Sequence, residues 1–389
     1  MNVQDLNYLI KSISNEKKNI YKKISVGTNS SHINFLKRSN FKYEVETLSP
    51  SEKLFKICSK NGKLIDSFAF PFYPNTTQLA SELTKDKSKL EDHFHRHGFN
   101  TTHSKVYHFD EVEKAKSDFI SLNSINGAVI KPLNSSLGKG VFVNVPVNRF
   151  NESWQYSKDD LSISEKRNSK KLKFIVQNYI PGFEARATIL QGTLVSILAR
   201  IPPYVIGDGI NPIKKLINIK NDEREKCKYL SKHPIKITKK ISEFLISQQL
   251  SLGSIPQNGE YVLLSSVSNI VGGGEIINIT DKVSENIKEF ALDVLASIPG
   301  IYSGGLDLIL NSYSDQNPHI LEVNTYPVIS LTKYPTFGSP SHPSKILFES
   351  LIAQYQLSIS KEDQYDIDNS EVYIKDFINF TKRRLKFLT

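Results

Sequence analysis

The chain has 389 residues, of which 39% are hydrophobic and 10% aromatic, so it can form roughly two or three domains with sizeable cores. Its formal net charge of +10 is spread along the sequence, which suits an anionic substrate but does not by itself indicate nucleic acid as a partner. Cys58 and Cys227 lie far apart without metal-ligand spacing, which argues against a disulfide framework and structural zinc and fits a cytoplasmic protein. No run of about 18 apolar residues predicts a transmembrane segment, and the first residues lack a signal-peptide pattern.

The first 98 residues alternate short apolar runs with polar stretches. Residues 24–27 and 64–68 lie next to turn signals and predict two strands. Apolar residues at helical spacing over 76–98 predict a helix that stops at Gly98, because glycine readily adopts the backbone conformation that ends a helix.

The next hundred residues or so are predicted to be mainly strands. A helix is expected over 110–122. Polar and charged residues with few large apolar side chains fill 151–171, which predicts an irregular or mobile insert. The Gln191-Gly192 pair predicts a hairpin over 185–201. The other expected strands are 105–108, 127–132, 140–146 and 174–180.

The remainder of the chain has helical patterns around two strands that carry acidic residues. We expect the helices near 235–249, 289–297 and 343–355. The basic, aromatic segment 371–389 predicts a helix that packs its Phe and Leu face, with contact to a membrane surface or a polyanion as the alternative. The cations expected to lie in solvent on this helix are Lys382, Arg383, Arg384 and Lys386.

A loop of small residues at 134–140 lies between two apolar runs. Small residues let backbone N–H groups approach a phosphate closely, so the loop is a candidate polyphosphate site, and a plain hairpin turn is the alternative. It is not a P-loop, because GxxxxGK[ST] is absent, and no HRD or DFG supports a protein kinase. Lys131 ends the preceding run, where it can neutralise a phosphate or extend its charge into solvent.

Acidic and amide side chains interrupt two otherwise apolar strands further on. Glu322 and Asn324 are two residues apart, so they share one face of a strand, and Asp307 lies in a strand expected to pair with it. Carboxylate and amide oxygens suit Mg²⁺. A solvated polar face is the alternative, disfavoured because groups buried in apolar strands need partners.

Seven segments in order resemble the ATP-grasp superfamily of carboxylate–amine ligases. They are TKDKSKL (84–90), VIKPLNSSLGKGV (129–141), FIVQNYIPGFEAR (174–186), ARIPPYVIGDGINPIKKLI (199–217), SNIVGGGEIINITDKV (268–283), GLDLIL (305–310) and EVNTYPVISLTKYPTFGSP (322–340). The resemblance covers about residues 76–352 and is greatest to the ATP-grasp module of cyanophycin synthetase, followed by that of bifunctional glutathione synthetases. Residues 1–75 match only loosely.

The resemblance implies an ATP-grasp fold of the α+β / α/β class, in three parts with a tail. The N-terminal α/β, pre-ATP-grasp-like domain would be residues 1–98 and the lid subdomain 99–180. The C-terminal ATP-grasp subdomain, holding the metals and most substrate contacts, would be 181–356, and the basic helical tail 357–389.

The resemblance also implies how a nucleotide is bound. The ATP phosphates would contact Lys87 and Lys131. The mobile phosphate lid would contain Ser135, Ser136, Gly138 and Gly140. The adenine would be held by Gln177, Asn178 and Ile180, and the ribose by Glu184. Gln177 departs from the Glu common in the family, so its amide oxygen can accept from the adenine amino group while its N–H₂ must find another partner.

Metal binding and catalysis are implied for a second set. Two Mg²⁺ ions, with Mn²⁺ as an alternative, would be held by Asp307, Glu322 and Asn324. The carboxylate or acyl phosphate would be bound by Arg200 and Arg186, with Lys131 also catalytic. The amino-acid pocket would be shaped by Ser265, Asn269 and residues 272–274.

The implied reaction is ATP-dependent ligation. A carboxylate attacks the γ-phosphate to give an acyl phosphate and ADP, and an amine then forms the amide and releases phosphate. The expected substrates are a small-molecule or peptide carboxylate and an amine, acidic if the basic surplus is used, in peptide or natural-product biosynthesis; a homo-oligomer is compatible with the resemblance. The alternatives are a non-catalytic nucleotide-binding module and an ATP-grasp kinase acting on a small molecule.

Overall fold

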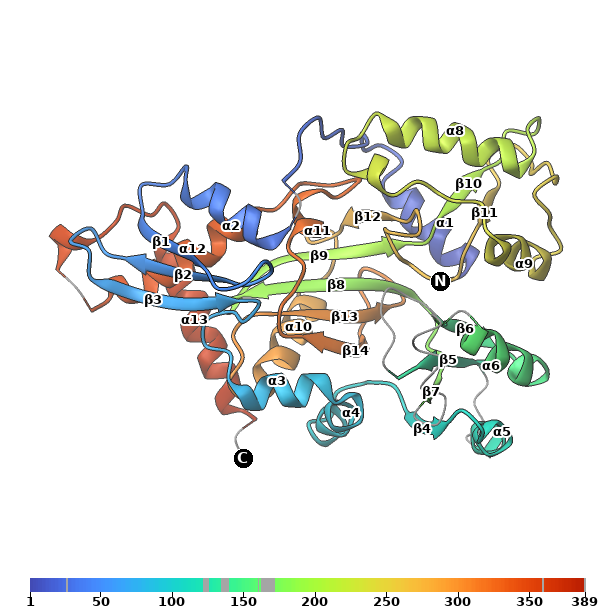
Figure 1. Cartoon of the computed structure of the whole chain (residues 1–389), viewed down its shortest axis with the longest axis horizontal. Coiled ribbons are helices and arrows are strands. Elements are labelled where there is room, and N and C mark those ends of the chain that lie inside the picture. The colour runs from blue at the N-terminus through green and yellow to red at the C-terminus, as the bar shows by residue number, and fades with distance from the viewer. Residues whose placement is uncertain are drawn as a thin grey trace.

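The computed structural model describes residues 1–25, 27–121, 126–133, 140–159, 161, 172–358 and 360–387. Over these residues the strands form a three-, a two-, a five- and a four-stranded sheet, and every strand pairing is antiparallel. The five-stranded sheet crosses the middle of the molecule, with the three-stranded sheet at one end and the four-stranded sheet near the other (Figure 1).

The central sheet has the strand order β12-β9-β8-β13-β14. Its strands are β8 (Phe183–Leu190), β9 (Thr193–Ile201), β12 (Glu275–Asn278), β13 (Gly304–Leu310) and β14 (His319–Asn324). Gln191 and Gly192 form the turn between β8 and β9 with φ angles of 50° and 79°, as the favoured two-residue hairpin turn requires. The hairpin predicted for 185–201 is therefore confirmed.

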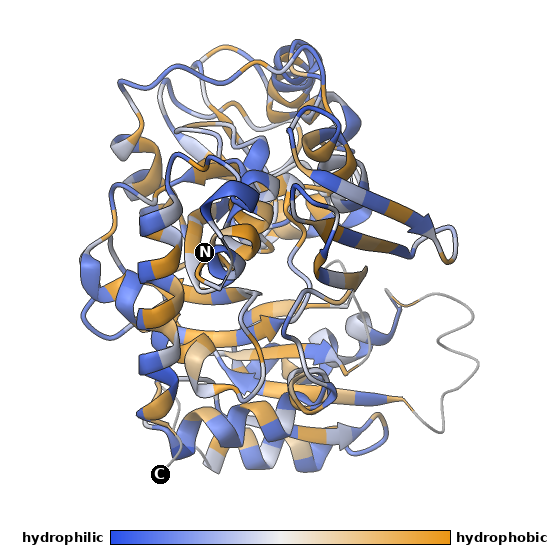
Figure 2. Cartoon of the chain, turned by 90° about the vertical axis from the view of Figure 1, so that its left-hand side faces the viewer, coloured by the Kyte–Doolittle hydropathy of each residue, from blue (hydrophilic) through white to orange (hydrophobic). Residues whose placement is uncertain are grey.

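The two faces of the central sheet differ in chemistry, because successive side chains point to opposite faces. On one face Ala185 and Ile189 belong to the main hydrophobic core, which also includes residues of α1 (Val3–Ser12) and α10 (Glu285–Ser297). Figure 2 shows the strands that cross the interior largely orange, as this burial of apolar residues requires. The opposite face of β8 carries Arg186, and the candidate site lies there.

The four-stranded sheet, with order β4-β7-β5-β6, has a hydrophobic core of its own. Its strands are β4 (Ser104–His108), β5 (Ala128–Pro132), β6 (Phe142–Val145) and β7 (Lys173–Asn178). The strands predicted in this part of the chain are therefore confirmed. The helices against it are α5 (Val112–Ser121), η1 (Val147–Arg149) and α6 (Phe150–Asp159).

Helix α6 contradicts the first half, residues 151–159, of the irregular insert predicted at 151–171. Phe150, Ser153, Trp154 and Ser157 are all buried, at helical spacing. Trp154 stacks on Phe174 with ring centroids 4.8 Å apart, and its indole N–H donates to a backbone carbonyl at 2.9 Å. One tryptophan and one phenylalanine thus supply enough apolar area for a helix whose composition is otherwise polar. Residues 160 and 162–171 lie outside the described part of the chain.

The N-terminal region contains a three-stranded meander and short helices. The strands are β1 (Lys42–Thr47), β2 (Lys53–Cys58) and β3 (Leu64–Phe70), so the strand predicted at 64–68 is confirmed. The predicted helix over 76–98 is divided into α3 (Gln78–Lys85) and α4 (Lys87–Arg96). The division occurs because the Asp86 side chain caps α4 by accepting from the Lys89 N–H at 3.1 Å.

The strand predicted at 24–27 is wrong for the described residues of that segment. They are irregular, and α2 (Thr28–Leu36) begins directly after Gly27, whose φ of 97° does not suit a strand.

The core of the N-terminal sheet is shared with a helix from the other end of the sequence, α12 (Pro343–Gln356). Phe55 and Phe68 stack with centroids 5.3 Å apart, and both rings lie against Phe348 of α12 at 6.2 and 6.1 Å. The division of the chain at 98, 180 and 356 stays a prediction.

The remaining elements surround the central sheet. They are β10 (Tyr204–Ile206), β11 (Tyr261–Leu263), α8 (Ile213–Glu225), η3 (Leu230–Lys232), α9 (Lys239–Ser247), α11 (Ser330–Lys333), η4 (Lys361–Asp363) and α13 (Ser370–Leu385). Helices α9, α10 and α12 confirm the three helices predicted after residue 230. Within the described ranges no helix is both long and apolar enough to cross a membrane.

Helix α13 packs against the centre of the molecule. Phe380 is 1% exposed and belongs to the main core, where its Cβ lies so close to Gly192 that a side chain on that glycine would meet it at 2.8 Å. The prediction that four cations of this helix lie in solvent is wrong for two of them. Arg383 donates to Asp293 at 2.8 Å and to Glu289, and Arg384 donates to the Ile301 carbonyl. Their partners lie some 80–90 residues away along the chain, where a local pattern does not reveal them.

Phe380→Ala tests whether α13 is part of the main core. We expect the free energy of unfolding to fall by about 3–5 kcal/mol, because the change removes a buried ring and leaves a cavity. Urea denaturation measures the change. Ile378→Ala on the same helix is the matched control, since Ile378 is 43% exposed and its loss is expected to cost less than about 0.5 kcal/mol. Equal effects of the two changes would contradict the packing described.

Candidate functional site

A row of charged side chains lies on the polar face of the central sheet. Arg186 of β8 is directly opposite Asp307 of β13, which is directly opposite Glu322 of β14. Residues paired in this way share one face of a sheet and lie side by side. The register therefore brings the three together although they are far apart in the sequence.

Asp307 holds the centre of this row. Its carboxylate accepts two hydrogen bonds from the Arg186 guanidinium, at 2.6 Å from Nε and 2.5 Å from Nη2, and lies 3.2 Å from Nη2 of Arg200 on β9. Asp307 is only 8% exposed. Burial raises the pKa of Asp307, but Arg200 and Arg186 outweigh burial and bring the pKa to about 2, so the carboxylate stays ionised at neutral pH.

Glu184 extends the row on the other side of Arg200. Its carboxylate lies 3.7 Å from Nη1 of Arg200, which thus contacts Glu184 and Asp307 with different nitrogens. Burial raises the pKa of Glu184, and the nearby charge of Arg200 opposes that rise. Arg200 keeps a 21% exposed side chain, so part of its guanidinium can be reached by a ligand.

Glu322 and Asn324 of β14 lie on one face, as the strand alternation predicted. The Asn324 amide N–H donates to Oε1 of Glu322 at 3.2 Å, which directs the Asn324 amide oxygen elsewhere. With Asp307 they form a set of hard oxygen donors. Mg²⁺ takes one or two carboxylates and completes its shell with phosphate oxygens and water, so these residues fit it. Among the described residues no three His, Cys, Asp or Glu side chains are grouped so that they could hold a metal ion.

Two lysines from outside the central sheet approach this row. Lys131 lies on β5, and Lys87 is the first residue of α4, with its ammonium 4.0 Å from Oε2 of Glu322. Burial, and next the neighbouring charge of Lys87, lower the pKa of Lys131 to about 8, while Glu322 and Glu184 oppose the shift. The charges of Glu322 and Glu184 on the central sheet are thus close enough to influence Lys131 of the four-stranded sheet.

Gln177 and Asn178 lie at the end of β7, where the chain leaves the four-stranded sheet. The Gln177 amide N–H₂ donates to the hydroxyls of Thr102 at 2.9 Å and Ser104 at 2.5 Å. The partner that the sequence required for this N–H₂ group is therefore present. The Asn178 amide oxygen accepts from the His103 N–H at 2.8 Å, and Ile180 follows in the segment leading to β8.

Of the residues expected to form the phosphate lid, only Gly140 is within the described part of the chain. Its φ is +66°, and an added side chain would meet Pro132 and the Ser157 carbonyl at 2.8 Å, so only glycine fits. The Gly140 carbonyl accepts from the Ser157 hydroxyl at 2.5 Å. The other three residues expected there lie outside the described ranges: Ser135, Ser136 and Gly138.

The residues expected to shape an amino-acid pocket are divided by the structure. Ser265, Asn269 and Gly272 line a cavity of about 1050 Å³ between β6 and α9. Gly274 is instead packed against backbone, since a side chain there would meet the Ile201 carbonyl at 2.5 Å, and its own carbonyl accepts from the buried Arg224.

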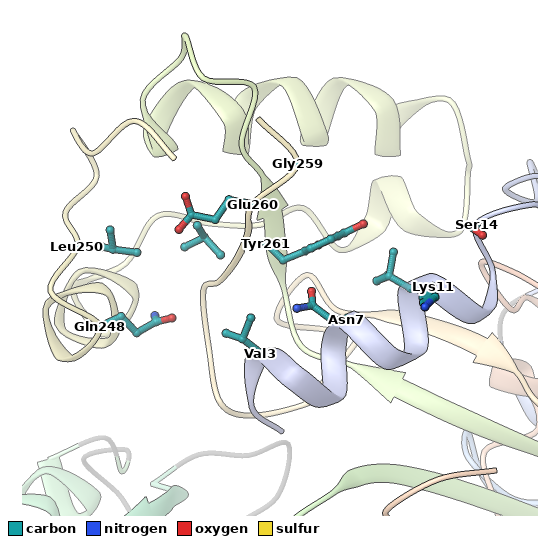
Figure 3. Close-up of a pocket in the computed structure, with 11 residues that line it drawn as sticks. Val3, Asn7, Lys11, Ser14, Gln248, Leu250, Gly259, Glu260 and Tyr261 are labelled. Atoms are coloured by element: carbon teal, nitrogen blue, oxygen red, sulfur yellow. The ribbon is translucent and has the colours of Figure 1, made fainter. Parts of the chain in front are cut away.

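A second cavity, of about 890 Å³, lies between α1 and β11. Figure 3 shows Val3, Asn7 and Lys11 of α1 on one side and Glu260 and Tyr261 on the other. It contains none of the residues in the charged row, so we do not assign the candidate site to it.

Sequence reasoning missed two charged groups. Glu91 follows Lys87 by one helical turn on α4, and this i, i+4 spacing could have revealed it. The second is the buried Glu275, whose carboxylate lies within 3.3 to 3.6 Å of three cations, Lys18, Lys220 and Arg224. These cations come from distant parts of the sequence, so no local pattern marks the cluster.

Asp307→Asn tests the central ion pairing. We expect the free energy of unfolding to fall by about 3 kcal/mol at neutral pH, because two buried arginines lose their charged partner. Asp222→Asn, at an exposed position of α8, is the matched control and should change it by less than about 0.5 kcal/mol.

The difference between wild type and Asp307→Asn should also depend on pH. The pKa of Asp307 is about 2 in the folded chain, against 3.8 for an unperturbed aspartate. Its stabilisation is therefore complete above the higher value and is lost as pH falls towards the lower one. Urea denaturation at neutral and at acidic pH measures this, and a difference that grows on acidification would contradict the pairing.

No family model matches the sequence. Over 240 residues the chain is 30% identical to the glutathione biosynthesis bifunctional protein of Clostridium perfringens, a match of 59% of this chain and 29% of that protein. Over 259 residues it is 29% identical to cyanophycin synthetase of Synechocystis, a match of 63% of this chain and 28% of that protein. The chain thus spans less than a third of the length of these curated relatives.

Among solved structures, the bifunctional glutathione synthetase of Pasteurella multocida superposes with a TM-score of 0.54 at 18% identity, covering 84% of this chain and 43% of that one. This likeness shows a common fold and confirms the mixed α/β class expected from the sequence, to which the structure adds that the sheets are antiparallel. The chain belongs to the ATP-grasp ligase superfamily, as a distant relative of the ATP-grasp regions of glutathione- and cyanophycin-forming synthetases.

Proposed function

We propose that this protein is an ATP-dependent carboxylate–amine ligase, which forms an amide bond through an acyl phosphate and releases ADP and phosphate. The observation that carries the proposal is the charged row Arg186–Asp307–Glu322, which Lys131 of β5 and Lys87 of α4 approach from outside the central sheet. Such a site can neutralise a polyphosphate and position it for attack, which is most of what phosphoryl transfer requires of a protein.

The nucleotide would lie between the two sheets. Lys131 and Lys87 would bind its phosphates, and Glu184 would accept hydrogen bonds from the ribose hydroxyls. The base would lie at the end of β7, held by Gln177, Asn178 and Ile180. Support comes from the positions of these side chains: Lys131 and Gln177 belong to paired strands of one sheet, and their cross-strand partners Ile175 and Val129 place both on the same face.

Mg²⁺ would be held by Asp307, Glu322 and Asn324, as one or two ions. When bound, it would neutralise charge on the phosphate oxygens. The structure adds one constraint, because both Asp307 oxygens already accept from arginines. Glu322 and Asn324 would therefore supply the more accessible oxygens.

The two arginines would have different roles. Arg186 uses two of its nitrogens on Asp307, so it positions that carboxylate. Arg200 contacts its two carboxylates at the longer distances of 3.2 and 3.7 Å and keeps some exposure, so it is better placed to bind the substrate carboxylate or the acyl phosphate. A planar guanidinium suits both groups because each presents two oxygens to it.

The substrates would be a small-molecule or peptide carboxylate and an amine. Two relatives are named for glutathione biosynthesis and cyanophycin synthesis, which supports amino-acid-type substrates. The net charge of +10 supports an acidic one.

The same Asp307 contacts favour a second candidate, a nucleotide-binding module without turnover. Both oxygens of Asp307 accept from arginines, so a metal at Asp307 would have to use the remaining lone pair of Oδ2 beside Arg186 or displace an arginine. Turnover separates the two candidates.

The decisive experiment measures phosphate release from Mg-ATP across a panel of amino acids and acidic dipeptides, with mass spectrometry of the products. The ligase predicts ADP, phosphate and a product whose mass is the sum of two substrates minus water. The control is Asp307→Asn combined with Glu322→Gln, which should reduce release at least about a hundredfold. Tight Mg-ATP binding without release for any pair would support the non-catalytic module, and phosphate transferred stably to a substrate would support a kinase.

The affinity for Mg-ATP should depend on the charge of Lys131. Without nucleotide the pKa of Lys131 is about 8, lowered chiefly by burial, and only the charged ammonium pairs with phosphate. We therefore expect the dissociation constant to rise above about pH 8 by up to about tenfold per pH unit. Isothermal titration calorimetry over this range measures it.

Lys131→Met should bind Mg-ATP more weakly and lose this pH dependence. Lys89→Met is the matched control, since Lys89 is a mostly exposed lysine of α4. An unchanged pH profile in Lys131→Met would contradict a role for Lys131 in phosphate binding.

A further inference from the structure

We propose that Glu91, which lies outside the sites assigned above, fixes the orientation of the Gln177 amide and thereby selects a 6-amino purine over a 6-oxo purine. The inference rests on the proposed function, in which the base lies at Gln177. Glu91 is a positioning residue on α4 that acts through two hydroxyl groups.

The geometry is a closed set of hydrogen bonds between α4, the segment leading into β4, and β7. Oε2 of Glu91 accepts from the Thr102 hydroxyl at 2.7 Å and from the Ser104 hydroxyl at 2.5 Å. Oε1 of Glu91 accepts from the Ser104 N–H at 2.6 Å. The oxygens of the same two hydroxyls accept from the Gln177 amide.

The direction of each bond follows from counting protons. A hydroxyl group has one proton to donate, and an ionised carboxylate can only accept. Both hydroxyl protons are therefore used on Glu91, and Thr102 and Ser104 present only lone pairs to Gln177. Gln177 must meet them with its N–H₂ group, because its carbonyl oxygen would find no donor there.

The consequence is that Oε1 of Gln177 is turned away from the hydroxyls. Within the described part of the chain it accepts no hydrogen bond, while the Gln177 side chain is otherwise buried. Gln177 lies on the same face of its sheet as Lys131, so an acceptor is presented beside the proposed phosphate site. A 6-amino group can donate to it, whereas a 6-oxo group would place two acceptors against each other.

Replacing Glu91 by glutamine reverses the chain of donors. The Ser104 N–H needs an acceptor, so the new amide keeps its oxygen there and turns its N–H₂ towards the two hydroxyls. The two hydroxyl groups then donate to Gln177 instead of to residue 91. Gln177 must therefore turn its amide oxygen to the hydroxyls and its N–H₂ group to the base. A carboxylate at 177 would restore an acceptor facing the base, because it has acceptors on both sides.

The test uses Mg-ATP and Mg-ITP, which differ only in the 6-amino and 6-oxo groups, with dissociation constants from isothermal titration calorimetry. Wild type should prefer ATP by at least about tenfold. In Glu91→Gln the ratio of the two constants should fall by about tenfold or invert. In the double variant Glu91→Gln with Gln177→Glu the preference for ATP should return. Glu82→Gln, an exposed glutamate of α3, is the matched control and should leave the ratio unchanged.

Three outcomes would overturn the inference. One is an unchanged ratio in Glu91→Gln. Another is equal weakening of both nucleotides without rescue in the double variant, which would mean that Glu91 only stabilises the packing of α4 on β4. The last is wild-type protein that binds neither nucleotide. That result would overturn the proposed function itself, and it is distinguishable from failure of the Glu91 inference because it is seen in the wild type, without any substitution.

Discussion

The pairing of Asp307 with Arg186 and Arg200 is the interaction on which the rest of the site depends. The three side chains come from β13, β8 and β9, so the pairing joins three strands of the central sheet across its polar face. All three are largely buried, where an unpaired charge would be strongly destabilising. Because each charge is compensated by another, these charged side chains can be buried on one face of the sheet. The same strand register also places Glu184 and Glu322.

The four-stranded sheet complements this arrangement with opposite charge. Its own core lies on one face, with Ile130 and Val176 buried there, while the alternate positions on the same strands point to the other face. Lys131 therefore brings an ammonium group towards a surface rich in carboxylates without disturbing either hydrophobic core. Burial lowers the pKa of Lys131, because without a bound anion its charge is poorly compensated. A polyanion between the sheets would meet the ammonium group of Lys131, and a cation would have to bridge it to the carboxylates of the central sheet.

Local pattern predicted what depends on neighbours in the sequence. Alternation along β14 was enough to place Glu322 and Asn324 on one face, and the Gln191-Gly192 pair was enough to locate the turn of the central hairpin. What local pattern could not predict depends on partners far away in the chain. The cations of α13 were predicted to lie in solvent, because their acceptors lie on and beyond α10, far away in the sequence. The polar composition of α6 predicted an irregular segment, but two buried aromatic rings are enough to fix it as a helix. The partners of Gln177 were required by its chemistry, but only the fold identifies them.

The main core has a consequence for the order in which the chain can fold during synthesis. It contains Leu6 and Leu9 of α1, the central strands, and Phe380 of α13, so residues almost 375 positions apart are packed around one sheet. The four-stranded sheet, by contrast, closes its core with residues between Tyr107 and Val176. A nascent chain can therefore complete the four-stranded sheet and its core early. The central sheet forms on a core that lacks the Phe380 ring until residue 380 has left the ribosome. During that interval the apolar surface that Phe380 covers beside the β8–β9 turn is exposed, and such exposed surface favours aggregation.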